Sequence, residues 1–144
     1  MTGERAVETL TRYLRLCDEP SPERTESALG ALFTEDAIWE GTGAEYAQRF
    51  GSTQGRDAIV KMLFGYQSAE NPLVRNVHLL FPGRVAVSGD TAEGSWQMQQ
   101  LSSYADGRAE VMVARLDVEF RTAGPDALIS RFGTCRLFRA ELGG

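Results

Sequence analysis

The chain has 144 residues, a length that suits one domain with a single hydrophobic core. Hydrophobic residues make up 42% and charged residues 24%, as in ordinary globular proteins. The net charge is −5 and Lys61 is the only lysine among scattered arginines, so no basic stripe is present to follow a phosphate backbone. The sequence has no apolar run of about 18 residues and no N-terminal signal pattern. We therefore expect a cytoplasmic protein that binds neither nucleic acid nor a membrane.

Cysteine and histidine are scarce. Cys17 and Cys135 are the only cysteines, and His78 is the only histidine. The cysteines form no CxxC pair and no second histidine accompanies them, so the ligand spacing of a zinc site is missing. We expect no metal site and two reduced thiols in the core. No repeat, low-complexity tract or linker divides the chain, which predicts a single domain over residues 1–144.

The first predicted element is an amphipathic helix over residues 3–18. Pro20 disfavours the helical conformation at Glu19, so the helix should end near Asp18. Its apolar face follows helical spacing and comprises Val7, Leu10, Leu14 and Cys17.

A second helix is predicted from Pro22, with Ser21 as its N-cap. Its apolar face would comprise Ala28, Leu29, Leu32 and Phe33. A short strand over Ala37–Glu40 follows, and then a glycine-rich loop over Gly41–Gly55, which could act as a lid over a site or be plainly disordered. A third helix is predicted over Arg56–Tyr66, with Ile59, Met62, Leu63 and Tyr66 facing inward.

The second half of the chain changes to the two-residue periodicity of strands. Strong turn residues such as Asp106-Gly107 separate the runs, which predicts antiparallel hairpins and excludes a doubly wound parallel sheet. Helices followed by a long meander indicate an α+β fold with helices on one face of a curled sheet. The predicted strands are Leu73–Phe81, Arg84–Val87, Thr91–Tyr104, Ala109–Thr122 and Leu128–Arg139.

Asp18 is a charged residue on an apolar face. It follows Val7 by eleven residues, about three helical turns, and so returns to the inward side of the first helix. The helix dipole disfavours a negative charge at this end, so an inward carboxylate needs a compensating partner. The alternative is a frayed helix end that leaves Asp18 in water.

His78 lies in the strand LVRNVHLLF, on the same face as Val74, Asn76 and Leu80. Alternation alone does not settle which face is buried, and a lone strand histidine is either structural or functional. A buried aspartate partner would favour function, because carboxylate–imidazole pairing fixes the tautomer and strengthens the free nitrogen as a base.

Three further strands carry polar residues of interest. Trp96, Met98 and Gln100 share one face, either as a pocket wall ending in an amide or as ordinary core. Arg136 alternates with apolar neighbours that include Phe138, so it needs an anion, either a substrate group or a carboxylate of the chain. An outward row of mixed charge is solvated or lies at a subunit contact; it comprises Arg115, Asp117, Glu119 and Arg121.

Taken in order, these segments resemble the NTF2-like superfamily. The resemblance rests on ALFTEDAIWEGTG after two helices, GRDAI opening a third, and the strand meander. It is strongest to the SnoaL-like branch, which includes polyketide cyclases, scytalone dehydratase and bile-acid dehydratases. It implies a cone in which three N-terminal helices pack on a strongly curved, mainly antiparallel sheet that encloses a pocket.

The dehydratases of this branch carry a characteristic set of site residues. RYLRLCDE matches their tyrosine and aspartate at Tyr13 and Asp18, RNVHLL matches their histidine at His78, and GTCRLF matches their arginine at Arg136. One position departs from the pattern, because GSWQMQQL places Gln100 where the bile-acid dehydratases have a second acid.

The resemblance implies a cofactor-independent enzyme that acts on a small hydrophobic molecule bearing a carbonyl or hydroxyl group. Asp18 would orient His78 for proton transfer next to a carbonyl, while Tyr13 and Arg136 would hold the oxygen or the substrate. Dehydration, isomerisation and cyclisation remain open, and the expected binding residues are Trp96, Met98, Gln100, Tyr46 and Trp39.

Two non-catalytic alternatives remain. The fold also serves as a small-molecule binder or assembly module, and as a subunit that supports a separate catalytic chain. We expect a homodimer, because this fold commonly leaves one sheet face for a partner to cover.

Overall fold

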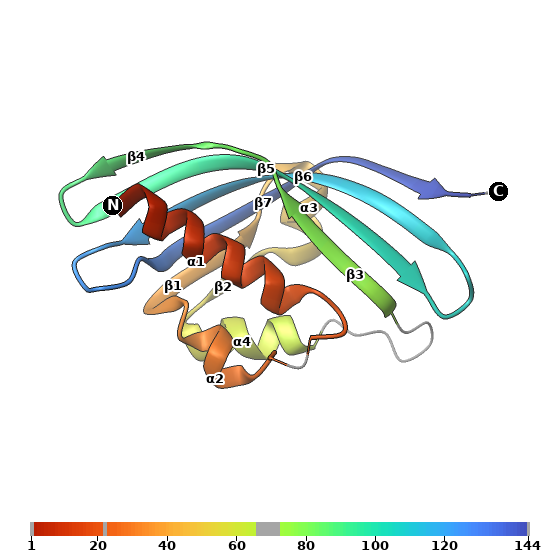
Figure 1. The fold of residues 1–144 in the computed structure, drawn as a ribbon, viewed down its shortest axis with the longest axis horizontal. Coiled ribbons are helices and arrows are strands. Elements are labelled where there is room, and N and C mark those ends of the chain that lie inside the picture. Colours follow the sequence, from red (N-terminus) through yellow and green to blue (C-terminus); the bar gives the residue numbers. More distant parts are fainter. Residues whose placement is uncertain (1, 22, 66–72, 144) are drawn as a thin grey trace.

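Seven strands form one strongly curved sheet, and helices fill its concave side (Figure 1). The computed structural model describes residues 2–21, 23–65 and 73–143. Its elements are α1 (Thr2–Cys17), α2 (Glu26–Gly30), β1 (Phe33–Gly41), α3 (Gly43–Phe50), β2 (Ser52–Gln54), α4 (Arg56–Phe64), β3 (Leu73–Leu80), β4 (Arg84–Ser88), β5 (Thr91–Tyr104), β6 (Ala109–Arg121) and β7 (Leu128–Leu142).

The strand order is β2-β1-β7-β6-β5-β3, and β4 pairs with β5 beyond the end of β3. The β1–β7 pair is parallel and the other pairs are antiparallel. This confirms the predicted α+β fold, with N-terminal helices and a mixed, mainly antiparallel sheet. The parallel pairing of β1 with β7 could not be predicted from hairpin spacing, because it joins two strands far apart in the sequence.

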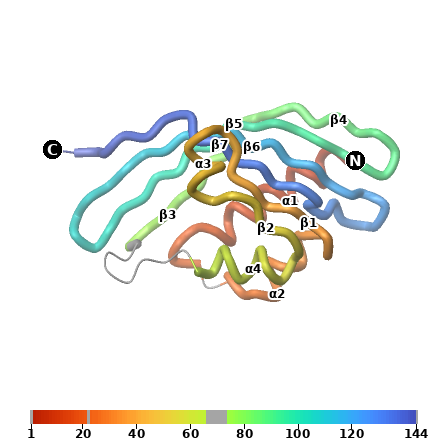
Figure 2. Tube along the Cα trace, turned by 180° about the vertical axis from the view of Figure 1, so that it is seen from behind, coloured from red at the N-terminus to blue at the C-terminus, as the bar shows by residue number. Residues whose placement is uncertain are grey.

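The prediction of a loop over Gly41–Gly55 is wrong. This segment forms helix α3 and strand β2, so the described part of the chain has four helices rather than three. Two glycines of this segment mark the ends of a helix: Gly43 is the first residue of α3 and Gly51 is its C-cap. Both adopt positive φ angles, 76° and 60°, which suit glycine. α3 contacts both β1 and β7 and lies beside these two strands (Figure 2).

The predicted start of the second helix is also wrong. Thr25, not Ser21, is the N-cap of α2, and its hydroxyl accepts a 3.0 Å hydrogen bond from the Ala28 amide. Phe33 belongs to β1, which is longer than the predicted Ala37–Glu40 strand. Two residues of the prediction, Pro22 and Tyr66, lie outside the described residues.

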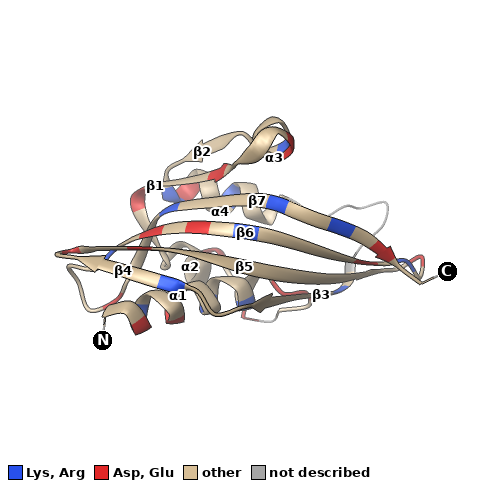
Figure 3. Ribbon diagram, turned by 90° about the horizontal axis from the view of Figure 1, so that it is seen from above, with Lys and Arg blue, Asp and Glu red and all other residues tan. Residues whose placement is uncertain are grey.

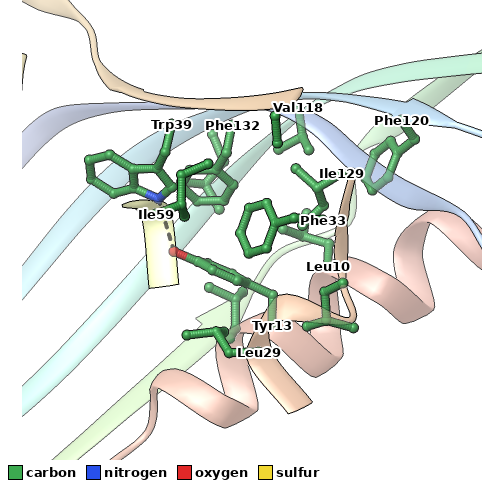
Figure 4. Packing of buried hydrophobic residues seen from close by; sticks show 14 of the residues in the cluster. Leu10, Tyr13, Leu29, Phe33, Trp39, Ile59, Val118, Phe120, Ile129 and Phe132 are labelled. Atoms are coloured by element: carbon green, nitrogen blue, oxygen red, sulfur yellow. Dashed lines mark hydrogen bonds between the residues drawn. The ribbon is translucent and has the colours of Figure 1, made fainter. Parts of the chain in front are cut away.

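The core lies between α1, α2, α4 and the concave sheet face (Figure 4). Tyr13 from α1 packs edge-on against Phe33 and tilted against Phe132, with ring centroids 5.8 and 4.8 Å apart. The Trp39 indole N–H donates a 3.1 Å hydrogen bond to the Tyr13 hydroxyl oxygen. The largest fully buried side chains are Phe33, Phe120, Leu10, Leu29, Ile59, Leu116, Ile129 and Val118.

Burial on α1 changes two acid groups. It raises the pKa of Cys17 to about 11 and that of Tyr13 well above its usual value of 10.0. Both side chains are therefore protonated at neutral pH.

The convex face of the sheet carries the predicted row of mixed charge (Figure 3). Arg115 and Asp117 on β6 form an exposed ion pair with an N–O distance of 3.0 Å. Arg121 pairs with Asp36 from β1 at 3.0 Å. A hydrogen bond from the Thr34 hydroxyl and, after it, the contact with Arg121 lower the pKa of Asp36. These pairs are exposed to solvent and contribute little to stability.

We predict that Gly94→Ala destabilises the protein by about 1–3 kcal/mol. A β-carbon at Gly94 would lie 2.7 Å from the carbonyl oxygen of Arg84 and would collide with the Trp96 ring. Gly124→Ala is the control, because a β-carbon there meets nothing within 4 Å. Guanidinium unfolding measures both; equal free energies of unfolding for the two variants would contradict the close approach of β4 and β5.

We also predict that stability declines above pH 9. The native state holds the Cys17 proton more tightly than the unfolded chain, so stability is complete below the ordinary cysteine pKa of 9.0 and is lost as the pH rises through about 11. The expected loss between pH 8 and pH 10 is about 1 kcal/mol. Guanidinium unfolding of Cys17→Ala under reducing conditions should show a smaller decline over this range, and an unchanged slope would contradict the assignment.

Candidate functional site

The C-terminal end of α1 is fastened to β3. The backbones of Glu19 and Asn76 exchange two hydrogen bonds, of 3.0 and 2.9 Å. Two residues along β3, the backbone N–H of His78 donates to Asp18 Oδ1 at 2.8 Å. This donor compensates the carboxylate at a helix end whose dipole opposes it. The end of α1 is thus neither frayed nor turned to solvent.

The Asp18 and His78 side chains also meet. Asp18 Oδ1 lies 2.8 Å from His78 Nδ1, and the exposed fractions of the two side chains are 30% and 8%. A carboxylate only accepts hydrogen bonds, so this contact assigns the proton to Nδ1. Nε2 has no hydrogen bond to any residue that the structure describes, which leaves it available to a ligand.

His78 lines a hollow of about 320 Å³ between the end of α1, α3 and the concave sheet face. This volume is at the lower end of the range for small-molecule pockets. Six residues singled out in the sequence line it: Tyr13, Trp39, Tyr46, His78, Gln100 and Arg136. The structure therefore brings together residues of six elements: α1, β1, α3, β3, β5 and β7.

The floor of the hollow is one row of residues across four strands. His78 on β3 pairs with Gln100 on β5, Gln100 pairs with Met112 on β6, and Met112 pairs with Arg139 on β7. Paired residues in neighbouring strands point to the same side of a sheet. His78 and Arg139 are therefore at opposite ends of a single row on the concave face.

A bulge in β7 brings Arg139 into this row. Ala114 pairs with Arg136 but the preceding Val113 pairs with Phe138, so β7 contains one extra residue at this point. Beyond the bulge the faces of the strand exchange. Phe138, expected on the face of Arg136, is 55% exposed on the convex side, and Arg139 points to the hollow instead.

Aromatic side chains close the hollow on the helical side. Tyr13 accepts a hydrogen bond from Trp39 and its own O–H is directed to the Cys17 sulfur, and its raised pKa, due first to burial, keeps it protonated. The Tyr46 hydroxyl from α3 donates to the Met112 sulfur at 2.8 Å, and burial raises its pKa. Phe50 packs edge-on against Trp39, with ring centroids 5.5 Å apart.

Trp96 and Met98 do not line this hollow. Met98 is buried in the core, and Trp96 packs edge-on against Phe120 at a centroid distance of 6.3 Å. Trp96 also borders a separate depression between α1 and β3. Strand residues rise about 3.3 Å each, so Trp96 lies about 13 Å along β5 from Gln100, beneath the helix and away from the hollow. The prediction that Trp96, Met98 and Gln100 share one face of β5 is correct, but the hollow reaches only Gln100 of the three.

Gln100 belongs to a polar chain at the floor. Its Nε2 donates to the Ser102 hydroxyl at 3.3 Å, which donates to Asn76 Oδ1 at 2.8 Å. The hollow does contain acids, but elsewhere: Glu110 accepts a 2.8 Å hydrogen bond from the Tyr104 hydroxyl and pairs with Arg139 at 2.6 Å. Continuing the inward alternation of Ala114 and Met112 back along β6 would have identified Glu110.

Two lining residues, Arg24 and Arg49, had no signal in the sequence, and neither did Glu45, the partner of Arg136. Arg24 forms an ion pair with Glu19 and donates to the Leu63 carbonyl oxygen at 2.8 Å. Arg136 forms an ion pair with Glu45, which lies in the segment expected to be a loop. Arg49 from α3 lines the hollow and lies over the Phe50 ring, 5.1 Å from its centroid. The contacts of Arg24 with Leu63 and of Arg136 with Glu45 depend on tertiary structure.

A larger depression, of about 630 Å³, lies on the convex face. It is open, and Glu40, Glu93, Asp117, Glu119 and Arg131 are among the side chains around it. No aromatic or imidazole side chain is among its lining residues, so it lacks the apolar wall that is typical of small-molecule sites. Within the described residues, no three potential ligands are grouped around a metal position, and no helix is long and apolar enough to cross a bilayer.

The fold is similar to that of several solved structures. A type 2 hexachlorocyclohexane dehydrochlorinase (LinA) aligns with a TM-score of 0.78 and 17% identity over 98% of this chain and 88% of that one. A protein of Novosphingobium aromaticivorans that is provisionally assigned as a scytalone dehydratase aligns at 0.76 and 16%, over 98% and 87%.

A subunit of a larger assembly has a similar fold. The β subunit of a provisionally assigned aromatic-ring-hydroxylating dioxygenase from N. aromaticivorans aligns with a TM-score of 0.72 and 12% identity, over 94% of this chain and 89% of that one. At these identities the similarity establishes the fold and leaves the chemistry open.

The sequence itself identifies the family. No curated protein matches the chain significantly. The model of the SnoaL-like domain matches residues 4–124, which include Tyr13, Asp18 and His78 but end before β7. The chain therefore belongs to the SnoaL-like domain family, within the NTF2-like fold.

Proposed function

We propose that this protein is a cofactor-independent acid–base enzyme that acts on a small hydrophobic molecule bearing a carbonyl or hydroxyl group. The observation that carries the proposal is the 2.8 Å contact between Asp18 and His78 beside a hollow of about 320 Å³. An imidazole with one nitrogen held by a carboxylate and the other free is arranged for proton transfer. Structural neighbours named as a dehydrochlorinase and a dehydratase support this reaction class.

The proposed chemistry begins with His78 Nε2 removing a proton from the carbon next to the substrate carbonyl. The carbon–hydrogen electron pair moves toward the carbonyl oxygen, and the Tyr13 O–H stabilises the resulting enolate. Protonated His78 then returns the proton, either to a leaving hydroxyl in dehydration or to another carbon in isomerisation. Asp18 stabilises the imidazolium between these steps.

The surroundings support this sequence of steps. Trp39, Tyr46 and Phe50 form an aromatic wall that excludes water, which strengthens the electrostatic interactions inside. Tyr13 is protonated because burial raises its pKa, so it acts as a hydrogen-bond donor. Gln100 beside His78 is a neutral donor and acceptor that can position a carbonyl or hydroxyl group without competing for the proton.

Deuterium exchange tests the step that dehydration, isomerisation and cyclisation share. The probe is 2-tetralone in D₂O, with loss of the signals of protons next to the carbonyl followed by NMR and corrected for buffer exchange. The wild type should accelerate exchange, and His78→Gln should lower the enzyme-dependent rate by about a hundredfold or more. Asp18→Asn should lower it by about tenfold or more, because the amide no longer fixes the tautomer.

Asp117→Asn is the matched control, since Asp117 is an exposed carboxylate on the convex face that pairs with Arg115. It should exchange at the wild-type rate. Circular dichroism and thermal unfolding verify that each variant is folded. A folded His78→Gln variant with undiminished exchange would refute the acid–base mechanism.

The second candidate is a non-catalytic binding or assembly module. Its support is the neighbouring dioxygenase β subunit and the apolar part of the convex face, where Leu79, Leu137 and Phe138 are exposed. Absence of His78-dependent exchange, with a small molecule still bound, would favour this alternative.

We expect a homodimer that covers the convex face around Phe138. Phe138 is 55% exposed and pairs across the sheet with Val113 on the same face. Light scattering after size exclusion should give a dimer for the wild type and a shift toward monomer for Phe138→Asp, because an interfacial charge opposes burial. A wild-type monomer that aggregates would instead favour a subunit that needs another chain.

A further inference from the structure

Arginine is concentrated in the hollow of a protein with a net charge of −5. Four arginines line it, Arg24, Arg49, Arg136 and Arg139, against the two glutamates Glu19 and Glu110. Excess positive charge in a concave site attracts anionic ligands. We propose that the ligand carries a carboxylate, held by Arg136 at the end of the hollow opposite His78. This inference rests on the proposed function and narrows its substrate class.

The ion pairs of the hollow single out Arg136. The two lining glutamates are already engaged, Glu19 with Arg24 and Glu110 with Arg139. Arg136 has no carboxylate partner among the lining residues, and its one ion pair is with Glu45, outside the hollow. The positive charge of Arg136 is therefore available to a ligand.

Arg136 also has a buried hydrogen-bond donor that is unsatisfied among the described residues. Its side chain is only 13% exposed, and its Nε is buried without a hydrogen-bond partner among the residues that the structure describes. The guanidinium lies over the Tyr46 ring, 5.2 Å from its centroid, which orients its plane. A planar guanidinium suits the two oxygens of a carboxylate.

Glu45 is the carboxylate with which a ligand in the hollow would compete for Arg136. Its side chain is 62% exposed, so its ion pair with Arg136 is screened and contributes little. Loss of this partner on ligand binding would cost little free energy, because Glu45 would return to water. The contact itself indicates the ligand chemistry, since this arginine already pairs with one carboxylate while its Nε has no hydrogen-bond partner among the described residues.

The floor of the hollow sets the length of the ligand. His78 on β3 and Arg136 on β7 are separated by three strand spacings, about 14 Å between the strand backbones. Both side chains line the hollow, so a ligand that reaches both is shorter than this separation. A compact cyclic keto acid fits both this span and the volume of about 320 Å³.

The first test compares matched ligands on the wild type. The probes are 4-oxocyclohexanecarboxylate with its carboxamide, and benzoate with benzamide, with dissociation constants measured by NMR titration. We expect each carboxylate to bind about tenfold or more tightly than its amide, since charge-assisted hydrogen bonds to arginine favour the anion. Added sodium chloride should reduce this preference.

The second test assigns the preference to a residue. Arg136→Gln should reduce it to about twofold or less, while Arg115→Gln, on the convex face, should retain it. Glu45→Gln should tighten carboxylate binding about threefold and leave amide binding unchanged, because it removes the competing carboxylate.

Two outcomes would overturn the proposal. One is a wild type that binds no carboxylate of the set more tightly than its amide, including one that binds none of them. The other is a folded Arg136→Gln variant that keeps the full preference. Both readouts are affinities, so they stand apart from the exchange assay. Carboxylate selectivity without His78-dependent exchange would retain this site and reject the acid–base chemistry.

Discussion

The candidate site depends on the attachment of one helix end to one strand. Two backbone hydrogen bonds between Glu19 and Asn76 hold the end of α1 beside β3. Asp18 then accepts both the backbone N–H and the Nδ1 proton of His78. One carboxylate oxygen therefore ends the helix, joins it to the sheet and orients the imidazole. Without this attachment the same residues would be a solvated helix end and an ordinary strand histidine.

The hollow is built from the hydrophobic core and is continuous with it. Tyr13 packs on Phe33 and Phe132 inside the core, and its hydroxyl reaches the hollow next to Trp39. Burial raises the pKa of Tyr13 and keeps its hydroxyl protonated, so the packing of this ring in the core also sets its protonation state. Side chains that line the hollow, such as Tyr13 and Trp39, are therefore also packed side chains of the core.

Sheet geometry distributes charge within the hollow. A single extra residue in β7 turns Phe138 outward and Arg139 inward, and the same register places His78 at the other end of the row. One end of the hollow is therefore suited to proton transfer and the other to an anion. Because chains named as a dehydrochlorinase and as a dioxygenase β subunit share this fold, local features of this kind distinguish one chain from another.

The sequence alone determined the α+β fold, the strand meander and an inward Asp18, because periodicity and turn residues are local signals. It also singled out His78, Tyr13 and Arg136, which line or adjoin one hollow in the structure. Tertiary structure decided the rest. The helix α3, the inward Arg139, and the position of Trp96 outside the hollow depend on strand pairing, a bulge and the extent of a cavity. These are long-range contacts, and no pattern within one segment encodes them.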